Sequence, residues 1–507
     1  MKKNFDFDVA CSSLWRKVKE FRYEICSSLF FGLLAYGFYF TNMVYNHDSM
    51  NKIVLPYDWY YTLGRWVIDL LAYVFPHPTM PWYDGLVSLC LYTAGICMIS
   101  SLFQFKNKYT RILLAAVIIS FPSFCVEYLY VYQAIYYSLA FVLAVSSVLL
   151  WIHAKNVWWH VGAAICVVLC LGLYQGLLTV VSSLMVVFLV KQLLQGDIPP
   201  RKVLGEVLTG IAVLVAGVAV YFMLTEAVFL IRGNGFNGYA REAMEGTLPL
   251  YKRVLMPFLQ MYLDIITSHE IVVTRFSTCA HLLSIICCAY AIIRWMRDRA
   301  FGEQSLLLLL LVLFPVSVYF MWFALSSHVG SILVYVGFIS IYVLMAVVTE
   351  NVKVRKWMPN VVKIALCCII FANVRFANVT AMRTKLLYDH TFSFYTTLVT
   401  QIKSSGLLDG QSKLAICGRT DQFLCDIKKK YPYRTWYTGE GVNNYSKQNF
   451  VRFLLGFDIP AASAGEKGKI VASDGFKEMP IYPDEGSIRK FGNVIVVKFS
   501  HEVKDKH

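Results

Sequence analysis

The feature that most limits what this chain can fold into is a series of long apolar runs. A helix that crosses a bilayer needs about 20 predominantly apolar residues, and the sequence contains about eleven such segments by that criterion. They are 24–44, 85–104, 112–128, 134–152, 159–174, 176–192, 207–230, 277–295, 305–324, 329–349 and 360–378. The pattern therefore predicts a polytopic α-helical membrane protein.

The composition agrees with this prediction and argues against other classes. Of the 507 residues, 57% are hydrophobic and only 16% are charged, whereas a soluble domain carries about a quarter charged residues. The net charge of +15 does not indicate a nucleic-acid partner, because Lys and Arg gather in the cytoplasmic loops of membrane proteins. Most of the 14 Cys lie inside apolar runs, where they act as small hydrophobic residues.

The distribution of Lys and Arg predicts the orientation in the membrane. Basic clusters at 16–22, 106–111 and 353–356 fall on one side, and the long loops 45–84 and 231–276 on the other side are poor in Lys and Arg. Basic residues accumulate on the cytoplasmic side, so we expect a cytoplasmic N-terminus. An odd number of spans then places the C-terminal region outside.

Two regions differ in composition. Residues 1–378 form the expected transmembrane domain with the outer loops 45–84 and 231–276, and 379–507 has the charge density of a small soluble α/β or α+β domain. Short helices are expected at 67–75, 250–266, 389–404 and 446–456, and strands at 413–418 and 493–499. In the C-terminal domain, Cys417 and Cys425 form either a disulfide or two small core residues.

The first outer loop holds most of the candidate functional residues. Asp48 and Asp58 suit proton acceptance or a divalent cation, although both also fit solvated loop acids. Arg65, in Gly-Arg-Trp, offers a bidentate grip on phosphate, or it extends to lipid headgroups. His47 and Lys52 are weaker versions of the same phosphate-binding argument.

Further polar candidates follow later spans on the same side. Glu127 and Gln133 flank the third and fourth spans, and we expect them near the outer surface. An ionisable group at the end of a span indicates function. Tyr174 and Gln175 form the tip of an apolar hairpin, where they bind sugar hydroxyls or simply make the turn. Phosphate-binding loops, dinucleotide fingerprints, zinc spacings and nucleophile elbows are not found in the sequence.

The residues 46–49 (Asn-His-Asp-Ser), 63–66 (Leu-Gly-Arg-Trp) and the hairpin at 174–175 make the chain similar to the bacterial GtrII-type glucosyltransferases. The resemblance implies a GT-C-like, inverting hexosyltransferase of the bacterial cytoplasmic (inner) membrane. It also implies transfer of glucose from a polyprenyl-phosphate (undecaprenyl) donor to a surface polysaccharide such as the O-antigen of lipopolysaccharide. The bilayer, a companion flippase and a donor-synthesising enzyme are the implied partners, without nucleic acid.

The resemblance also implies roles for residues. Asp48 becomes the general base or the group that positions metal or acceptor, with Asp58 in support, and Arg65 binds the donor phosphate. Related sequences carry an acid near the place of Gln133, so either Glu127 substitutes for it or no second acid is needed. This leaves the need for Mg²⁺ or Mn²⁺ open.

Two other functions remain alternatives. A transporter or flippase of lipid-linked sugar places polar groups at mid-membrane, whereas here they gather at one surface. Another envelope-glycan modifying enzyme, such as an O-acetyltransferase or a polymerase, shares the same setting. An acyltransferase is expected to carry a buried His or Arg pair on the inner side, which the sequence does not show.

Overall fold

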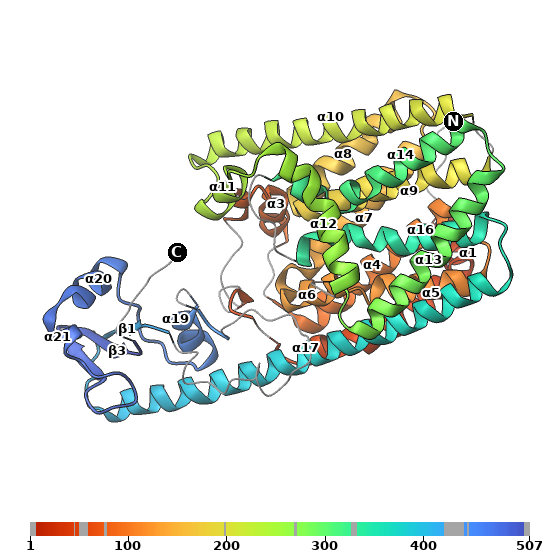
Figure 1. Ribbon diagram of the computed structural model, residues 1–507. Helices are drawn as coiled ribbons and strands as arrows, with labels where there is room; N and C mark the ends of the chain where they lie inside the picture. The colour runs from red at the N-terminus through yellow and green to blue at the C-terminus, as the bar shows by residue number, and fades with distance from the viewer. Residues whose placement is uncertain are drawn as a thin grey trace.

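The computed structural model describes residues 7–44, 46–49, 59–75, 79–196, 199–267, 271–325, 332–419, 441–443 and 446–500. Long helices dominate and run back and forth between the two ends of one bundle (Figure 1). This confirms the prediction of a polytopic helical protein.

Within the described residues, nine segments are long and apolar enough to cross a membrane. They are α2 (Arg22–Thr41), α4 (Pro81–Phe103), α5 (Lys108–Ile119) with α6 (Pro122–Leu129), η3 (Val131–Gln133) with α7 (Ala134–Ile152), η4 (Gln175–Leu177) with α9 (Leu178–Gln195), α10 (Pro200–Arg232), α13 (Arg275–Arg297), α14 (Phe301–Val318) and α17 (Trp357–Ser404). Two shorter apolar helices, α8 (Val157–Leu173) and α16 (Ile339–Asn351, preceded by η6 at Val336–Phe338), lie where the segments 159–174 and 329–349 were predicted.

Local capping sets where several of these helices begin and end. The Asn107 side chain accepts from the amide of Tyr109 at 2.9 Å and starts α5. Asn156 caps α8 in the same way, and Thr274 forms a capping box with Ser277 at the start of α13. Such caps satisfy amides that have no partner inside the helix.

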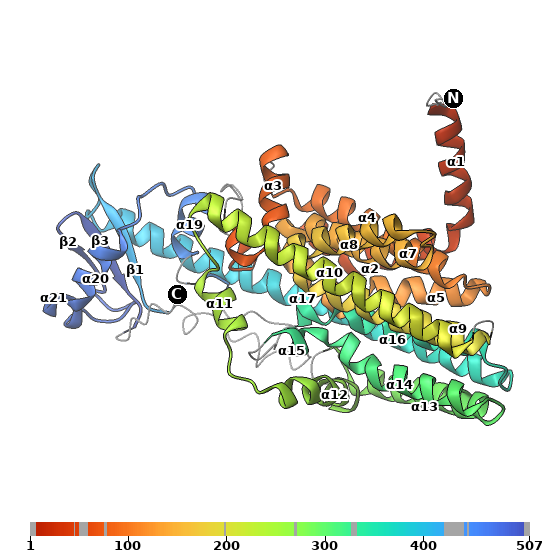
Figure 2. The ribbon, with the colours of Figure 1, turned by 90° about the horizontal axis from the view of Figure 1, so that it is seen from above.

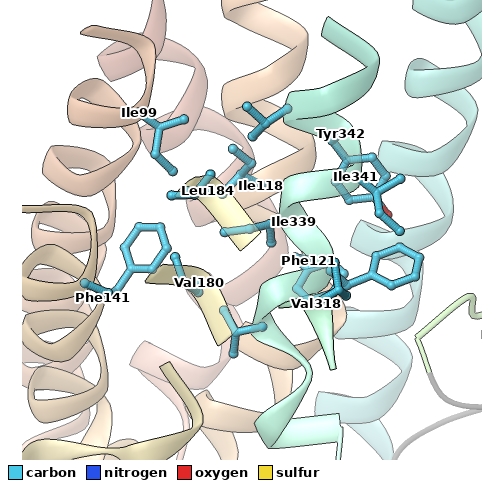
Figure 3. Close-up of a cluster of buried hydrophobic side chains, with 14 of the residues drawn as sticks. Ile99, Ile118, Phe121, Phe141, Val180, Leu184, Val318, Ile339, Ile341 and Tyr342 are labelled. Atoms are coloured by element: carbon cyan, nitrogen blue, oxygen red, sulfur yellow. The ribbon is translucent and has the colours of Figure 1, made fainter. Parts of the chain in front are cut away.

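The core lies between the helices of the bundle (Figure 3), where labelled side chains such as Ile99, Phe141, Leu184 and Ile339 are fully buried. Helix α7 packs on α4 and α8, and α10 packs on α8. Small residues allow the close approach of helices that membrane proteins use. A Cβ at Gly217 of α10, for example, would lie only 2.7 Å from Val167 of α8.

The two ends of the bundle differ. The end with the N-terminus carries α1 (Phe7–Glu20), which stands away from the bundle in Figure 2. The opposite end carries α3 (Trp66–Val74) and α11 (Gly238–Met244) (Figures 1 and 2). The helices expected at 67–75 and 250–266 are present as α3 and α12 (Leu250–Thr267), and a short helix α15 (Phe320–Ala324) packs on α12.

Helix α17 extends beyond the bundle and carries the C-terminal part (Figure 1). The segments 360–378 and 389–404, read as two helices from the sequence, are one, because no Gly or Pro lies between 360 and 404 to end it. The boundary expected at 378/379 therefore falls inside α17.

The C-terminal part contains a three-stranded sheet in the order β1-β3-β2. The strands β1 (Lys413–Cys417) and β3 (Val494–Lys498) are parallel and match the two expected strands, and β2 (Ile488–Phe491) is antiparallel to β3. Short helices accompany the sheet: α19 (Lys447–Asn449) with the π turn Phe450–Leu454, α20 (Ala464–Ala472) and α21 (Asp474–Lys477). Cys417 is buried in β1, and Cys425 lies outside the described residues.

Candidate functional site

Residues 46–49 form a turn that is fixed to the end of α6. The Asn46 side-chain oxygen accepts from the amides of Asp48 and Ser49 at 3.0 and 2.9 Å, a turn for which Asn is well suited. The Ser49 hydroxyl lies 3.4 Å from the carbonyl oxygen of Leu129 in α6. Asn46 and Ser49 are buried, so the turn holds the side chains between them in a defined place.

This turn presents His47 and Asp48 together. The His47 Nε2 lies 3.6 Å from Asp48 Oδ1, and the two side chains are 19% and 33% exposed. Asp48 therefore lies beside the His47 ring while a third of its side chain stays exposed, so a substrate hydroxyl can reach it, as a general base requires.

The segment around Arg65 is shaped by Asp69 and Gly64. The Asp69 carboxylate accepts from the amides of Tyr60 and Tyr61 at 3.2 and 2.6 Å and so caps the 3₁₀ turn η2 (Tyr60–Leu63). Gly64 follows with φ +73°, and a Cβ there would lie 2.2 Å from the Tyr221 hydroxyl. Both its dihedral angle and its crowding therefore require glycine.

Arg65 lies against the tip of the α8–α9 hairpin. Its Nε donates to Gln175 Oε1 at 3.4 Å, and its guanidinium carbon is 4.8 Å from the centre of the Tyr174 ring. Tyr137 packs edge-on against Tyr174, with 4.7 Å between ring centres. The structure thus brings together three of the sequence-derived candidates, Arg65, Tyr174 and Gln175.

The Gln175 amide ties this arrangement to α10. Its Nε2 donates to the Leu63 carbonyl at 2.8 Å and to the Tyr221 hydroxyl at 3.0 Å, and that hydroxyl donates to the Gly64 carbonyl at 3.1 Å. Gln175 therefore bonds to the protein itself. Tyr221 was missed in the sequence because a single Tyr inside a long apolar helix has no pattern that sets it apart.

Gln133 and Glu127 take different places. The Tyr137 hydroxyl donates to Gln133 Oε1 at 2.5 Å, which ties Gln133 to the ring beside Arg65. Both are buried, Gln133 at 3% and Glu127 at 1% exposure, and Glu127 accepts from the Tyr92 hydroxyl, so its carboxylate is not presented to solvent. The reason is that α6 is short and its whole length is enclosed by neighbouring helices.

Electrostatics make the Arg65 region attractive to an anion. Burial lowers the pKa of the Arg65 guanidinium, and the hydroxyls of Tyr137, Tyr174 and Tyr60 raise it by more, so it remains charged. Burial also raises the pKa of the Tyr60 hydroxyl, which stays neutral and able to donate. The result is a fixed positive charge enclosed by tyrosine side chains.

Segments of the two long loops 45–84 and 231–276 meet at this site. The Asn237 amide donates to the Thr62 carbonyl at 3.0 Å, and the Asn234 side chain donates to the Tyr61 hydroxyl at 3.0 Å. These bonds join the segments 59–66 and 234–237. The first loop therefore forms part of a larger surface at this end of the bundle.

Other expected contributors are not seen in this arrangement. Lys52 and Asp58 lie outside the described residues. Among the residues that are described, no group of three or more His, Cys, Asp or Glu is placed to hold a metal ion. No step below is derived through a metal ion.

The fold and the site together define a polytopic membrane protein with an arginine-centred polar site at one end of its helix bundle. The family model for Glucosyl transferase GtrII matches residues 37–348, more than half of the chain and all of the described site residues. The chain belongs to this family and is a glucosyltransferase. No curated protein and no solved structure matches it.

Proposed function

We propose that this glucosyltransferase moves glucose from a polyprenyl-phosphate donor to a cell-surface polysaccharide such as O-antigen. The observation that carries the proposal is the Arg65 guanidinium, held against Tyr174 and Gln175 at the same end of the bundle as Asp48. A fixed guanidinium suits the phosphate of the donor, and a reachable carboxylate suits the acceptor hydroxyl.

The proposed reaction is a single displacement at the anomeric carbon. The acceptor oxygen attacks the face opposite the phosphate and forms the new glycosidic bond, while Asp48 takes the hydroxyl proton. The bond from the anomeric carbon to the phosphate oxygen breaks, and polyprenyl phosphate leaves with its new charge stabilised by Arg65. In this proposal His47 orients the Asp48 carboxylate. Glu127 and Asp58 assist catalysis, and Lys52 assists substrate binding.

The proposal includes an orientation and a domain arrangement. We place about eleven spans in the bacterial inner membrane, with the N-terminus in the cytoplasm and residues 379–507 as an extracytoplasmic domain. Support comes from the basic clusters, which lie at the end of the bundle opposite the site. A donor made in the cytoplasm then requires a companion flippase and a donor-synthesising enzyme.

Glycan analysis of a deletion strain tests the proposal. We expect the deletion to remove one sugar from the surface polysaccharide and wild-type protein to restore it. Asp48→Asn is expected to lower the transfer rate by about 10²–10⁴-fold, because the general base is lost, while the protein still inserts.

Asp298→Asn is the matched control, because Asp298 is an exposed acid at the far end of α13. It is expected to restore the sugar fully. Full transfer by Asp48→Asn removes Asp48 from the mechanism. Surface glycans that are identical with and without the gene contradict the proposed function.

A further inference from the structure

A groove lies where α10 ends and α11 begins. It consists of two adjoining hollows of about 510 and 410 Å³, which share Arg241 and Glu245 in their walls. Both hollows are wide open to solvent, so they suit an extended chain lying along the surface better than an enclosed small molecule. The groove belongs to the segment 226–247 and contains none of the residues assigned above to the reaction.

The groove leads to Arg65. Its wall residue Asn234 bonds to Tyr61, and a Cβ at Gly64 would lie 3.3 Å from the ring of its wall residue Phe236. The wall of the groove therefore packs against the residues that directly precede Arg65 in the chain.

The lining favours hydroxyl groups over phosphate. Glu226, Glu242 and Glu245 outnumber the one cation of the lining, Arg241, so the groove is negative overall. A phosphate is repelled there and attracted to Arg65, whereas carboxylates accept hydrogen bonds from hydroxyls and Arg241 donates them. Phe229 packs edge-on against Phe236, with ring centres 4.7 Å apart, and gives the groove an apolar wall.

Two glycines in this region are not explained by the fold. A Cβ at Gly235 or Gly238 would meet nothing within 4 Å, and neither residue has a positive φ. Packing and backbone conformation therefore do not require glycine at either position. Their effect is to leave the backbone amides and carbonyls of the groove open to close approach by a ligand.

We propose that this groove binds the acceptor as a hydroxyl-rich, uncharged oligosaccharide chain, whose end reaches Arg65 and Asp48. The inference rests on the proposed function and extends it by separating two sites. The donor phosphate binds at Arg65, and the acceptor glycan binds between α10 and α11.

The test measures donor and acceptor kinetics separately with the full chain in lipid nanodiscs. The acceptor probe is the oligosaccharide repeat released from the surface polysaccharide of a strain that lacks this gene. Gly235→Trp adds a large side chain at the wall of the groove, and the double variant Glu226→Gln/Glu245→Gln brings the net charge of the lining to zero. In both, the KM for the oligosaccharide is expected to rise about tenfold or more, with the donor KM unchanged.

Gly302→Trp is the matched control, since a Cβ at Gly302 also meets nothing within 4 Å and the residue lies at the other end of the bundle. An unchanged acceptor KM in the groove variants overturns the inference, as does an equal rise in the donor KM. If Gly235→Trp fails to insert, the double Gln variant decides. Wild-type protein that transfers no sugar contradicts the proposed function itself and this inference with it.

Discussion

The Arg65 guanidinium is positioned by side chains from two segments, the α8–α9 hairpin tip and α10. Tyr174 supplies a ring face, Gln175 accepts from the guanidinium, and Tyr221 holds the Gly64 carbonyl next to it. A long flexible side chain loses rotamer freedom when it is fixed in this way. A site assembled in advance, however, loses less free energy when the ligand binds.

Variants of the two supporting residues are expected to differ in severity. Tyr221→Phe removes one hydroxyl, which costs about 0.5–1.5 kcal/mol and raises the donor KM by less than about tenfold. Gln175→Ala removes the acceptor for Arg65 and both amide bonds, so its donor KM is expected to rise further. Steady-state kinetics in nanodiscs measure both.

The control for this series is Tyr290→Phe, which alters a largely exposed tyrosine of α13. It is expected to leave the donor KM unchanged. If Gln175→Ala behaves like this control, Gln175 does not position Arg65.

The helices α2, α4 and α5 are joined near the N-terminal end of the bundle by one buried carboxylate. Glu24 of α2 is 1% exposed and accepts from Arg111 of α5 at 2.5 and 2.7 Å and from Ser100 of α4. Arg111 also donates to the Glu20 carbonyl at 2.7 Å, where α1 ends. The pair therefore sets how four helices meet.

Breaking this pair is expected to destabilise the bundle. Arg111→Met leaves the Glu24 carboxylate buried without its cation, which costs about 3–5 kcal/mol, and we expect a clear fall in the Tm of the detergent-solubilised protein. Glu24→Gln/Arg111→Met removes both charges and is expected to regain most of the loss. A single variant as stable as wild type would show that water already reaches Glu24.

The molecule as a whole joins an apolar bundle to a polar C-terminal part through α17. The far half of α17 contributes Tyr395, Leu398 and Ile402 to a buried cluster with Ile495 and Phe499. Around this cluster, exposed ion pairs such as Lys490 with Asp409 and Lys413 with Glu466 connect segments that are distant in sequence.

Because of these ion pairs, we expect the C-terminal part to lose folding stability in acid. Hydrogen bonding from Lys490 lowers the pKa of Asp409 to about 2, and that from Lys413 lowers the pKa of Glu466 to about 2. A lowered folded pKa gives stability that is present above the ordinary values of 3.8 and 4.5 and is lost as pH falls toward 2. Amide protection factors in the C-terminal part, which compare the observed exchange rate with that of an unfolded chain at the same pH, are expected to fall over this window.

The variant Asp409→Asn/Glu466→Gln serves as the comparison. It has no carboxylate at either position, so acid cannot break these two ion pairs in it. Its protection factors are expected to vary less between pH 4.5 and 2. A wild-type profile that matches this variant would assign the acid sensitivity to other groups.

Much of the fold was predictable because a membrane helix must satisfy its backbone hydrogen bonds internally. Apolar length alone therefore located the bundle helices, often to within a few residues, as for α7 and α13. The strands β1 and β3 followed from short apolar runs next to turn residues. The joining of 360–378 with 389–404 was not predicted, because the polar residues between them resemble a boundary between elements. These residues reduce helix stability only slightly, so the helix continues through them.

The site was predictable only in part. Arg65, Tyr174 and Gln175 stand out locally as polar groups at the ends of apolar runs, and they lie together. The role of Gln175 as a bond to Leu63 and Tyr221, and the burial of Glu127, depend on which helix faces meet. Those contacts join residues far apart in the chain, and they are set by side-chain packing between helices, which local apolarity and spacing do not encode.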